Sequence, residues 1–222
     1  MTGAESMVYV VDDDASFLKA VSRLLRASGF VVKTFSSAAD FLPQVVPGIQ
    51  GCLVADLHMP GVSGLEMQEA LLREGSLLPV VFLTGAGDIP STVRAMRRGA
   101  EDFLSKGAPK NDLLDAVRRA LARDVRQRAE RDRLDVLRAP FASLTPRDHE
   151  VLTHVLQGRL NKQIARKLGI DERSVKRHRS SIMTKLQTQS VVELTHLVHA
   201  VGFVQVDDAY GSSAESAPSA RP

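Results

Sequence analysis

The sequence is poor in cysteine and in long apolar runs, and both shortages restrict what the protein can be. Cys52 is the single cysteine, so no disulfide can form within the chain, and we expect a reducing compartment. No uncharged apolar run approaches the roughly 18 residues of a membrane span. The first six residues lack the basic start of a secretory signal peptide. These observations together predict a cytoplasmic protein without a membrane segment.

The charges are distributed unevenly along the chain. Residues 1–108 carry nine basic and twelve acidic side chains, whereas residues 143–203 carry ten basic and five acidic ones. An acidic first half joined to a basic second half indicates two different tasks. A polyanion is the expected partner of the basic half.

Strand-like and helix-like segments alternate through the first half. Short apolar runs predict five strands, at 7–11, 31–35, 52–56, 79–84 and 102–105. The intervening segments have helical spacing or helix caps, at 15–28, 37–43, 64–74 and 88–98. This alternation predicts an α/β domain with a doubly wound, five-stranded parallel sheet.

Polar side chains follow four of these strands directly. Asp12 and Asp13 come after the first strand, Asp56 ends the third, Thr84 ends the fourth and Lys106 follows the fifth. The carboxyl ends of parallel strands share one rim, where such sheets bind ligands. Three carboxylates there require a cation, and oxygen ligands suit Mg²⁺. Because a carboxylate can accept a phosphoryl group, the set predicts a Mg²⁺-dependent phosphorylation site with Asp56 as nucleophile.

Each of these residues also has an ordinary explanation. Asp56 alone could cap the turn at Met59-Pro60-Gly61, an acidic run after a strand is usually a solvated turn, and Thr favours strands. The prediction therefore rests on the set and on its place at strand ends.

The motifs at these positions resemble those of response-regulator receiver domains. Val-Asp-Asp at 11–13, Asp-Leu-His-Met-Pro-Gly at 56–61, Leu-Thr-Gly at 83–85 and Phe-Leu-Ser-Lys at 103–106 occur in that family's order. The resemblance covers residues 7 to about 120 and implies a flavodoxin-like fold. It also implies phosphorylation of Asp56 by a sensor histidine kinase. Mg²⁺ would be held by Asp13, Asp56 and the backbone carbonyl of His58, with Asp12 just outside that set.

The resemblance further implies a conformational switch. Thr84 and Phe103 would move together on phosphorylation and change the face made by the fourth helix and fifth strand. One departure bears on this site, because the family normally has Lys-Pro where this chain has Lys106-Gly107. Glycine loosens a loop, so we expect weaker or slower phosphorylation than in a Lys-Pro version.

The second half predicts a bundle of short helices. Residues 111–137 lack Gly and Pro and predict a long helix that becomes highly charged from Arg123 to Arg133, as a solvated spacer or a tether would. Thr145 before Pro146 marks a helix start, and helices are expected over 161–168, 172–186 and 191–201. The short connection at Gly169 is typical of a helix-turn-helix.

The helix over 172–186 carries the basic side chains expected of a recognition helix, although charge alone fits a merely solvated helix equally well. Leu-Thr-Pro-Arg-Asp-His-Glu-Val-Leu at 144–152, Asn-Lys-Gln-Ile-Ala at 161–165 and Ser-Val-Lys-Arg-His-Arg at 174–179 resemble the LuxR-type helix-turn-helix. The resemblance implies base contacts by Lys176, Arg177 and Ser180. Phosphate contacts would come from Lys162, His178, Arg179 and Lys185. Arg177 stands where an apolar residue is commoner, so the operator sequence is left open.

Together the two halves resemble the NarL/FixJ family of two-component transcriptional regulators. We expect a receiver domain at 1–121, a helical linker at 122–142, the helix-turn-helix domain at 143–203 and a disordered tail at 204–222. The resemblance implies promoter DNA and a second copy of the chain as partners, and RNA polymerase is a further candidate. Two alternatives stay open: a phosphorylation-independent DNA binder, suggested by Gly107, and a phosphatase that turns over through the same aspartyl phosphate.

Overall fold

The computed structural model of the protein describes residues 7–85 and 89–202. The chain forms two compact units, Met1–Glu130 and Arg131–Pro222, and their boundary falls inside one long helix, α5 (Lys110–Arg138). The predicted tail at 204–222 and the predicted helix start at Asp88 lie outside the described residues. None of the helices described has the length and low charge of a membrane span.

The first unit is built on one parallel sheet. Its strands are β1 (Met7–Val11), β2 (Val31–Phe35), β3 (Cys52–Asp56), β4 (Val80–Thr84) and β5 (Asp102–Ser105). They pair in parallel in the order β2-β1-β3-β4-β5. This is the flavodoxin-like order of a doubly wound sheet, so the predicted fold class is confirmed.

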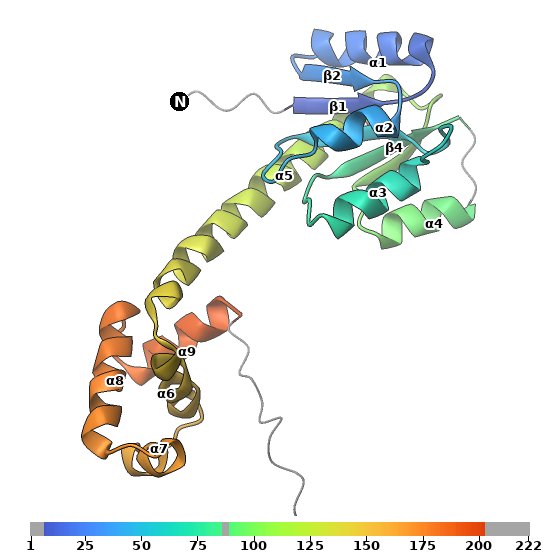
Figure 1. Ribbon diagram of the computed structural model, residues 1–222. Coiled ribbons are helices and arrows are strands. Elements are labelled where there is room, and N and C mark those ends of the chain that lie inside the picture. The colour runs from blue at the N-terminus through green and yellow to red at the C-terminus, as the bar shows by residue number, and fades with distance from the viewer. Residues whose placement is uncertain (1–6, 86–88, 203–222) are drawn as a thin grey trace, which may run out of the picture. The chain divides into compact units, whose positions relative to one another are not determined.

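Helices cover both faces of the sheet (Figure 1). They are α1 (Ala15–Ala27), α2 (Ala38–Phe41) with the short 3-10 helix η1 (Leu42–Gln44), α3 (Gly64–Arg73), α4 (Ile89–Arg97) and the first part of α5. One core layer joins α1 and α5 to the sheet, and the other joins α2, α3 and α4 to the opposite face. In β3, Val54 belongs to the first layer and Leu53 to the second, which explains its uninterrupted apolar run.

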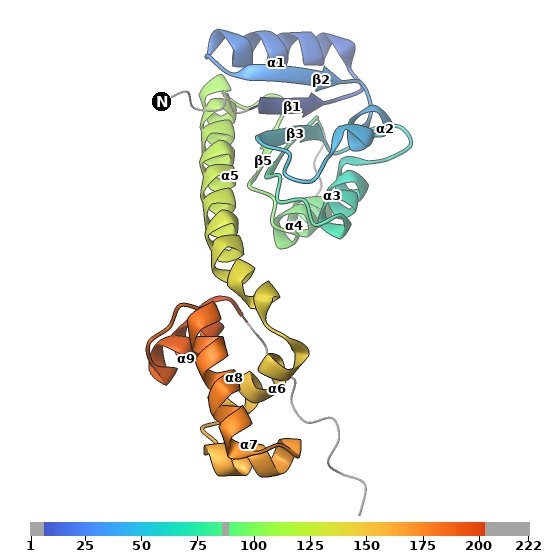
Figure 2. The same cartoon turned by 60° about the vertical axis from the view of Figure 1, so that its left-hand side comes forward.

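The second unit is a helical bundle (Figure 2). After the 3-10 helix η2 (Ala139–Ser143) come α6 (Pro146–Leu156), α7 (Asn161–Leu168), α8 (Glu172–Lys185) and α9 (Val191–Ala200). Thr145 caps α6 as predicted, with Pro146 in the first helical position, and Gly169 ends α7 in the left-handed conformation. The core is formed by apolar side chains from all four helices, with Ile164 and Ile182 almost fully buried.

The charged part of α5 is not wholly solvated, and the expectation for Arg123–Arg133 is wrong at Asp124. This side chain is 1% exposed, and its Oδ2 accepts hydrogen bonds from the Gly51 backbone N–H at 2.9 Å and from Arg128 at 2.7 Å. Gly51 itself admits no side chain, because a Cβ there would lie 1.9 Å from the Met7 carbonyl oxygen. The Asp124 carboxylate thus ties α5 to the start of β3, beyond Leu121, the last apolar side chain of that helix in the core of the sheet. The spacing of apolar residues could not predict this contact, because Asp124 is one of many charged residues in this part of the sequence.

We predict that Asp124→Ala destabilises the first unit by about 1–3 kcal/mol, because it leaves a buried N–H and a guanidinium without their acceptor. Hydrogen exchange of the peptides that contain β1 and β3 measures this loss. The matched control is Asp115→Ala in the same helix. Asp115 is 57% exposed and pairs with the exposed Arg118, so its effect should stay within about 0.5 kcal/mol. Equal protection in the two variants would contradict the role given to Asp124.

Candidate functional site

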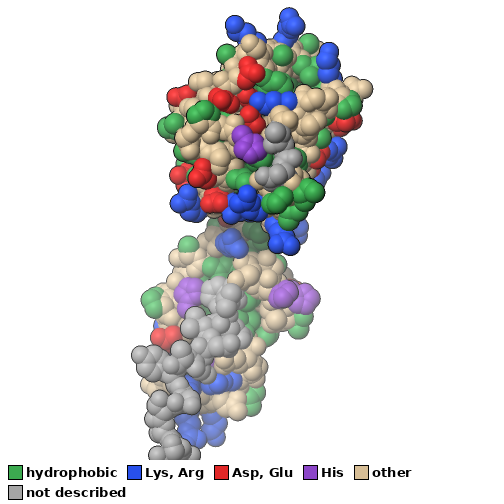
Figure 3. Space-filling view, turned by 90° about the vertical axis from the view of Figure 1, so that its right-hand side faces the viewer, with side chains coloured by type: hydrophobic (Ala, Val, Ile, Leu, Met, Phe, Trp, Pro, Cys, Tyr) green, Lys and Arg blue, Asp and Glu red, His purple; other side chains and the backbone are tan. Residues whose placement is uncertain are grey.

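The predicted acidic residues meet at the carboxyl rim of the sheet. Oxygen atoms of Asp12, Asp13 and Asp56 all lie within 4.8 Å of one another. The Lys106 Nζ lies 2.7 Å from Asp12 Oδ2 and 2.9 Å from Asp56 Oδ2. Asp12 and Asp56 are buried, whereas Asp13 is exposed. Figure 3 shows acidic, basic and histidine side chains gathered on one face of the unit that contains the sheet.

The electrostatics of this cluster follow from burial and from its one ammonium group. Burial raises the pKa of the Asp12 carboxyl, against the opposing effect of its bonds to Lys106 and to the Asp14 N–H. Desolvation would lower the pKa of Lys106, but its bonds to Asp12 and Asp56 outweigh this and raise it. Three carboxylates facing one ammonium leave a surplus of negative charge. An all-oxygen donor set with that surplus fits a hard divalent cation such as Mg²⁺.

Backbone geometry brings the start of a helix close to Asp56. Helix α3 starts beside it, and a Cβ at Gly64 would lie 2.3 Å from the Asp56 carbonyl oxygen. Glycine therefore lets α3 approach the end of β3 closely. Ser63 caps this helix through a capping box with Glu66.

The two predicted switch residues lie on the neighbouring strands. Thr84 is 2% exposed at the end of β4, and its Oγ1 lies 3.4 Å from His58 Nδ1. The half-buried Phe103 in β5 packs against Phe82, with ring centroids 6.2 Å apart. Thr84 therefore ends the strand beside β3, and Phe103 lies on the strand after that. The His58 ring contact with Thr84 had not been predicted, and the sequence motif held no signal for it.

The Gly107 departure does not displace Lys106. Residues 7–85 and 89–202 contain no cis peptide bond, so the Lys106–Gly107 bond is trans. The Lys106 backbone N–H donates to the Thr84 carbonyl at 2.8 Å, which fixes the start of the loop. The ammonium group reaches both buried carboxylates from this position.

In the second unit, α8 presents one exposed polar face. It consists of side chains three and four positions apart: Arg173, Lys176, Arg177, Ser180 and Thr184. All three predicted base contacts lie on it. Arg173 and Thr184 were missed, although their helical spacing from Lys176 and Ser180 was a usable signal.

Two predicted phosphate ligands point instead toward a buried carboxylate. His178 Nδ1 lies 2.8 Å from Asp148 Oδ1, and Lys185 Nζ lies 2.8 Å from Asp148 Oδ2. Asp148 is 2% exposed and also accepts from the Thr145 N–H at 3.1 Å. One carboxylate therefore links the start of α6 to two places on α8. Burial would raise the pKa of Asp148, but the bonds to Lys185 and His178 prevail and hold it well below the ordinary value of 3.8.

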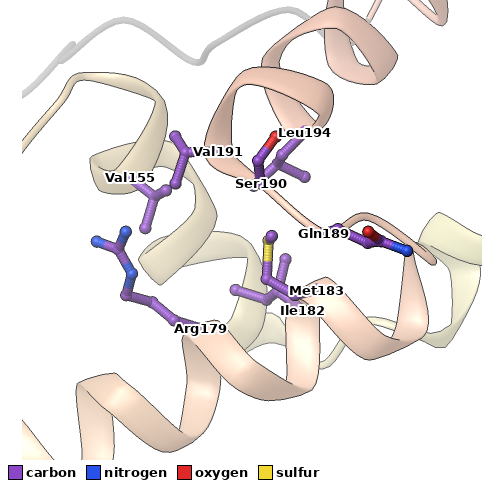
Figure 4. A pocket seen from close by; sticks show the side chains of 8 residues that line it. All are labelled: Val155, Arg179, Ile182, Met183, Gln189, Ser190, Val191 and Leu194. Carbon is purple, nitrogen blue, oxygen red and sulfur yellow. The ribbon is translucent and has the colours of Figure 1, made fainter.

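The half-buried Arg179 also makes a contact within the bundle. Its guanidinium donates to Asn161 Oδ1 at 3.2 Å. Figure 4 shows it beside a cavity of about 160 Å³ to which Val155 of α6, Ile182 of α8 and Leu194 of α9 also contribute. The fourth predicted phosphate ligand, Lys162, is exposed near the start of α7. Of the four, Lys162 alone is exposed, and the other three are half-buried.

Comparison with known proteins matches both halves. Residues 8–118 match the response regulator receiver domain family, and residues 142–198 match the luxR family of bacterial regulatory proteins. The response regulator protein TmoT of Ectopseudomonas mendocina is 44% identical over 197 residues, 89% of this chain and 90% of TmoT. The chain belongs to the NarL/FixJ family of response regulators. It is a transcriptional regulator with a receiver domain and a LuxR-type DNA-binding domain.

Two further relatives agree with this assignment. The transcriptional regulatory protein FixJ of Azorhizobium caulinodans is 39% identical, with 91% of this chain and 96% of FixJ covered. The solved structure of the response regulator StyR matches with a TM-score of 0.72 and 46% identity, over 88% of this chain and 99% of that one. The named relatives are regulators rather than enzymes.

We predict that Asp148→Asn destabilises the DNA-binding domain by about 1–3 kcal/mol at neutral pH, because Lys185 and His178 lose a charged partner. A carboxyl whose pKa is lowered by folding stabilises above its unfolded pKa, and this contribution disappears as the pH falls below that value. The wild-type domain should therefore lose stability below about pH 4, and Asp148→Asn should lose less.

Hydrogen exchange of α6 and α8 across pH tests both parts of the prediction. Glu150→Gln is the control, since Glu150 lies in the same helix and its side chain is 50% exposed. A variant Asp148→Asn with wild-type protection at every pH would show that the carboxylate does not hold α8.

Proposed function

We propose that a sensor histidine kinase phosphorylates Asp56 in a Mg²⁺-dependent reaction, and that this modification controls dimerisation and binding to promoter DNA. The observation that carries the proposal is the cluster of three carboxylates within 4.8 Å, with the Lys106 ammonium shared between two of them. A receiver domain implies a kinase partner, and a LuxR-type domain implies DNA.

In the proposed reaction an Asp56 carboxylate oxygen attacks the phosphorus of a phosphohistidine. The new O–P bond forms as the N–P bond breaks, and the electron pair stays on the imidazole nitrogen of the kinase. Lys106 would stabilise the developing negative charge on the phosphoryl oxygens. Asp13, Asp56 and the backbone carbonyl of His58 would hold Mg²⁺, with Asp12 beside them. When bound, the ion supplies positive charge for those same oxygens.

The switch would follow from the new acceptor on Asp56. The Thr84 hydroxyl, at the end of the strand beside β3, would donate to a phosphoryl oxygen, and Phe103 would turn inward with it. Helix α4 carries exposed apolar side chains at Ile89, Val93 and Met96, a surface suited to pairing with a second copy. A dimer would present two α8 helices to two half-sites.

For DNA recognition, the exposed face of α8 supports Lys176, Arg177 and Ser180 as base contacts. Arg173 at the edge of that face and Lys162 on α7 would contact phosphates. His178 and Lys185 fit a different part, because their bonds to Asp148 hold α8 against α6.

The alternative of phosphorylation-independent DNA binding rested on Gly107. Since Lys106 keeps both of its carboxylate partners, the structure gives this alternative no support. The phosphatase alternative would need a general acid near Asp56, for which His58 is the candidate, and catalytic turnover of a phosphoester substrate would favour it.

We predict that acetyl phosphate with Mg²⁺ adds one phosphoryl group to the full chain and none to Asp56→Asn, as intact-mass spectrometry would show. In gel shifts with the promoter upstream of its own operon, the phosphorylated wild type should bind more tightly than the untreated protein. Asp56→Asn should not respond. Equal DNA binding with and without phosphorylation would favour the phosphorylation-independent alternative, and phosphorylation of Asp56→Asn would place the acceptor elsewhere.

We predict that Lys176→Ala and Arg177→Ala each cost about 1–3 kcal/mol of binding to the operator and relax its sequence preference, because base contacts carry specificity. Wild-type affinity should also fall with salt, with a slope of about −0.9 in log K against log[salt] for each phosphate neutralised. Arg118→Ala, an exposed change in α5, is the control and should match the wild type. A flat salt response would rule out DNA as the partner.

A further inference from the structure

We infer that His58 is a positioning residue that holds the Thr84 hydroxyl in the resting receiver domain and so opposes its transfer to phosphorylated Asp56. This inference rests on the proposed function, because it concerns the same switch. It gives the His58 side chain a role in the switch. The family resemblance assigns a role only to the backbone carbonyl of His58, as a Mg²⁺ ligand.

The position of His58 brings its ring to the switch hydroxyl. Its backbone N–H donates to Asp56 Oδ1 at 3.3 Å, which fixes the turn after β3. From this turn the exposed side chain reaches β4, where Nδ1 lies 3.4 Å from Thr84 Oγ1. The contact therefore crosses from the turn that follows Asp56 to the neighbouring strand.

His58 and a phosphoryl group on Asp56 would compete for the Thr84 hydroxyl, because a hydroxyl group has a single proton. Thr84 Oγ1 can donate one hydrogen bond at a time, and with the proton on Nε2 the His58 Nδ1 accepts it. A phosphoryl oxygen on Asp56 needs that same proton. Because Thr84 is 2% exposed, water does not readily replace a lost partner. The His58 bond consequently stabilises the resting state relative to the switched one.

The length of the contact sets the size of the effect. At 3.4 Å this is a long hydrogen bond, so its loss should raise the population of the switched state by about two- to five-fold. While that state is rare, the apparent affinity of the unphosphorylated protein for DNA rises by the same factor.

The test compares two substitutions in the unphosphorylated full chain, with the operator affinity measured by titration. His58→Phe keeps a ring without an acceptor and should tighten binding by about two- to five-fold. His58→Asn can place an amide oxygen where Nδ1 lies and should restore the wild-type affinity. After phosphorylation the affinities of the three proteins should converge, because each has then switched.

A second background isolates the Thr84 contact. In Thr84→Val, which keeps the shape and removes the hydroxyl, His58→Phe should cause no further change in the affinity of the unphosphorylated protein. The inference is overturned if His58→Phe binds like the wild type or if its effect persists beside Thr84→Val. It also fails if phosphorylation leaves wild-type DNA affinity unchanged, but in that case the proposed function fails with it. If phosphorylation raises the DNA affinity of the wild type and His58→Phe has the same affinities as the wild type, the proposed function stands and only the role of His58 is rejected.

Discussion

The receiver domain depends on one ammonium group placed between two buried carboxylates. Lys106 lies within 3 Å of both Asp12 and Asp56, and without it their burial would be costly. The sheet order makes this possible, since β1, β3 and the end of β5 bring residues distant in sequence to one rim. The surplus negative charge on Asp13 and its neighbours then makes the rim suited to a divalent cation.

The DNA-binding domain uses the opposite arrangement. There a single buried carboxylate, Asp148, lies between two cationic side chains, and both belong to the helix that presents the basic face. Holding α8 at two points spaced two turns apart fixes its rotation about its own axis. Arg173, Lys176 and Arg177 can therefore project from the bundle as one face, while their basic neighbours in the sequence serve the packing of the domain.

The sequence was sufficient to predict the fold, because the short apolar runs of the strands and the helical spacing of the helices were both clear. The alternation of strands and helices predicted the parallel sheet. The helix caps at Thr145 and Gly169 helped to predict the helical bundle, with helix boundaries within one or two residues of those in the structure. The residues of the acidic cluster were also predictable, since each ends or follows a strand. Contacts that depend on the direction of a side chain could not be predicted from the sequence. Charge alone does not distinguish the exposed Lys176 from the bonded Lys185, nor the buried Asp124 from the exposed Asp115. The position of the His58 ring beside Thr84 likewise depends on the turn geometry.

The anchoring of Asp124 has a consequence for the spacing of residues along α5. The carboxylate can reach the loop before β3 only if it leaves the helix in the right direction relative to the apolar side chains that pack on the sheet, of which Leu121 is the last. Each residue of an α-helix advances that direction by about 100°. A single-residue insertion or deletion between Leu121 and Asp124 would thus turn the carboxylate away from Gly51 by more than a quarter of a revolution. The interval between the apolar side chains and Asp124 is therefore constrained by helical phase as well as by distance.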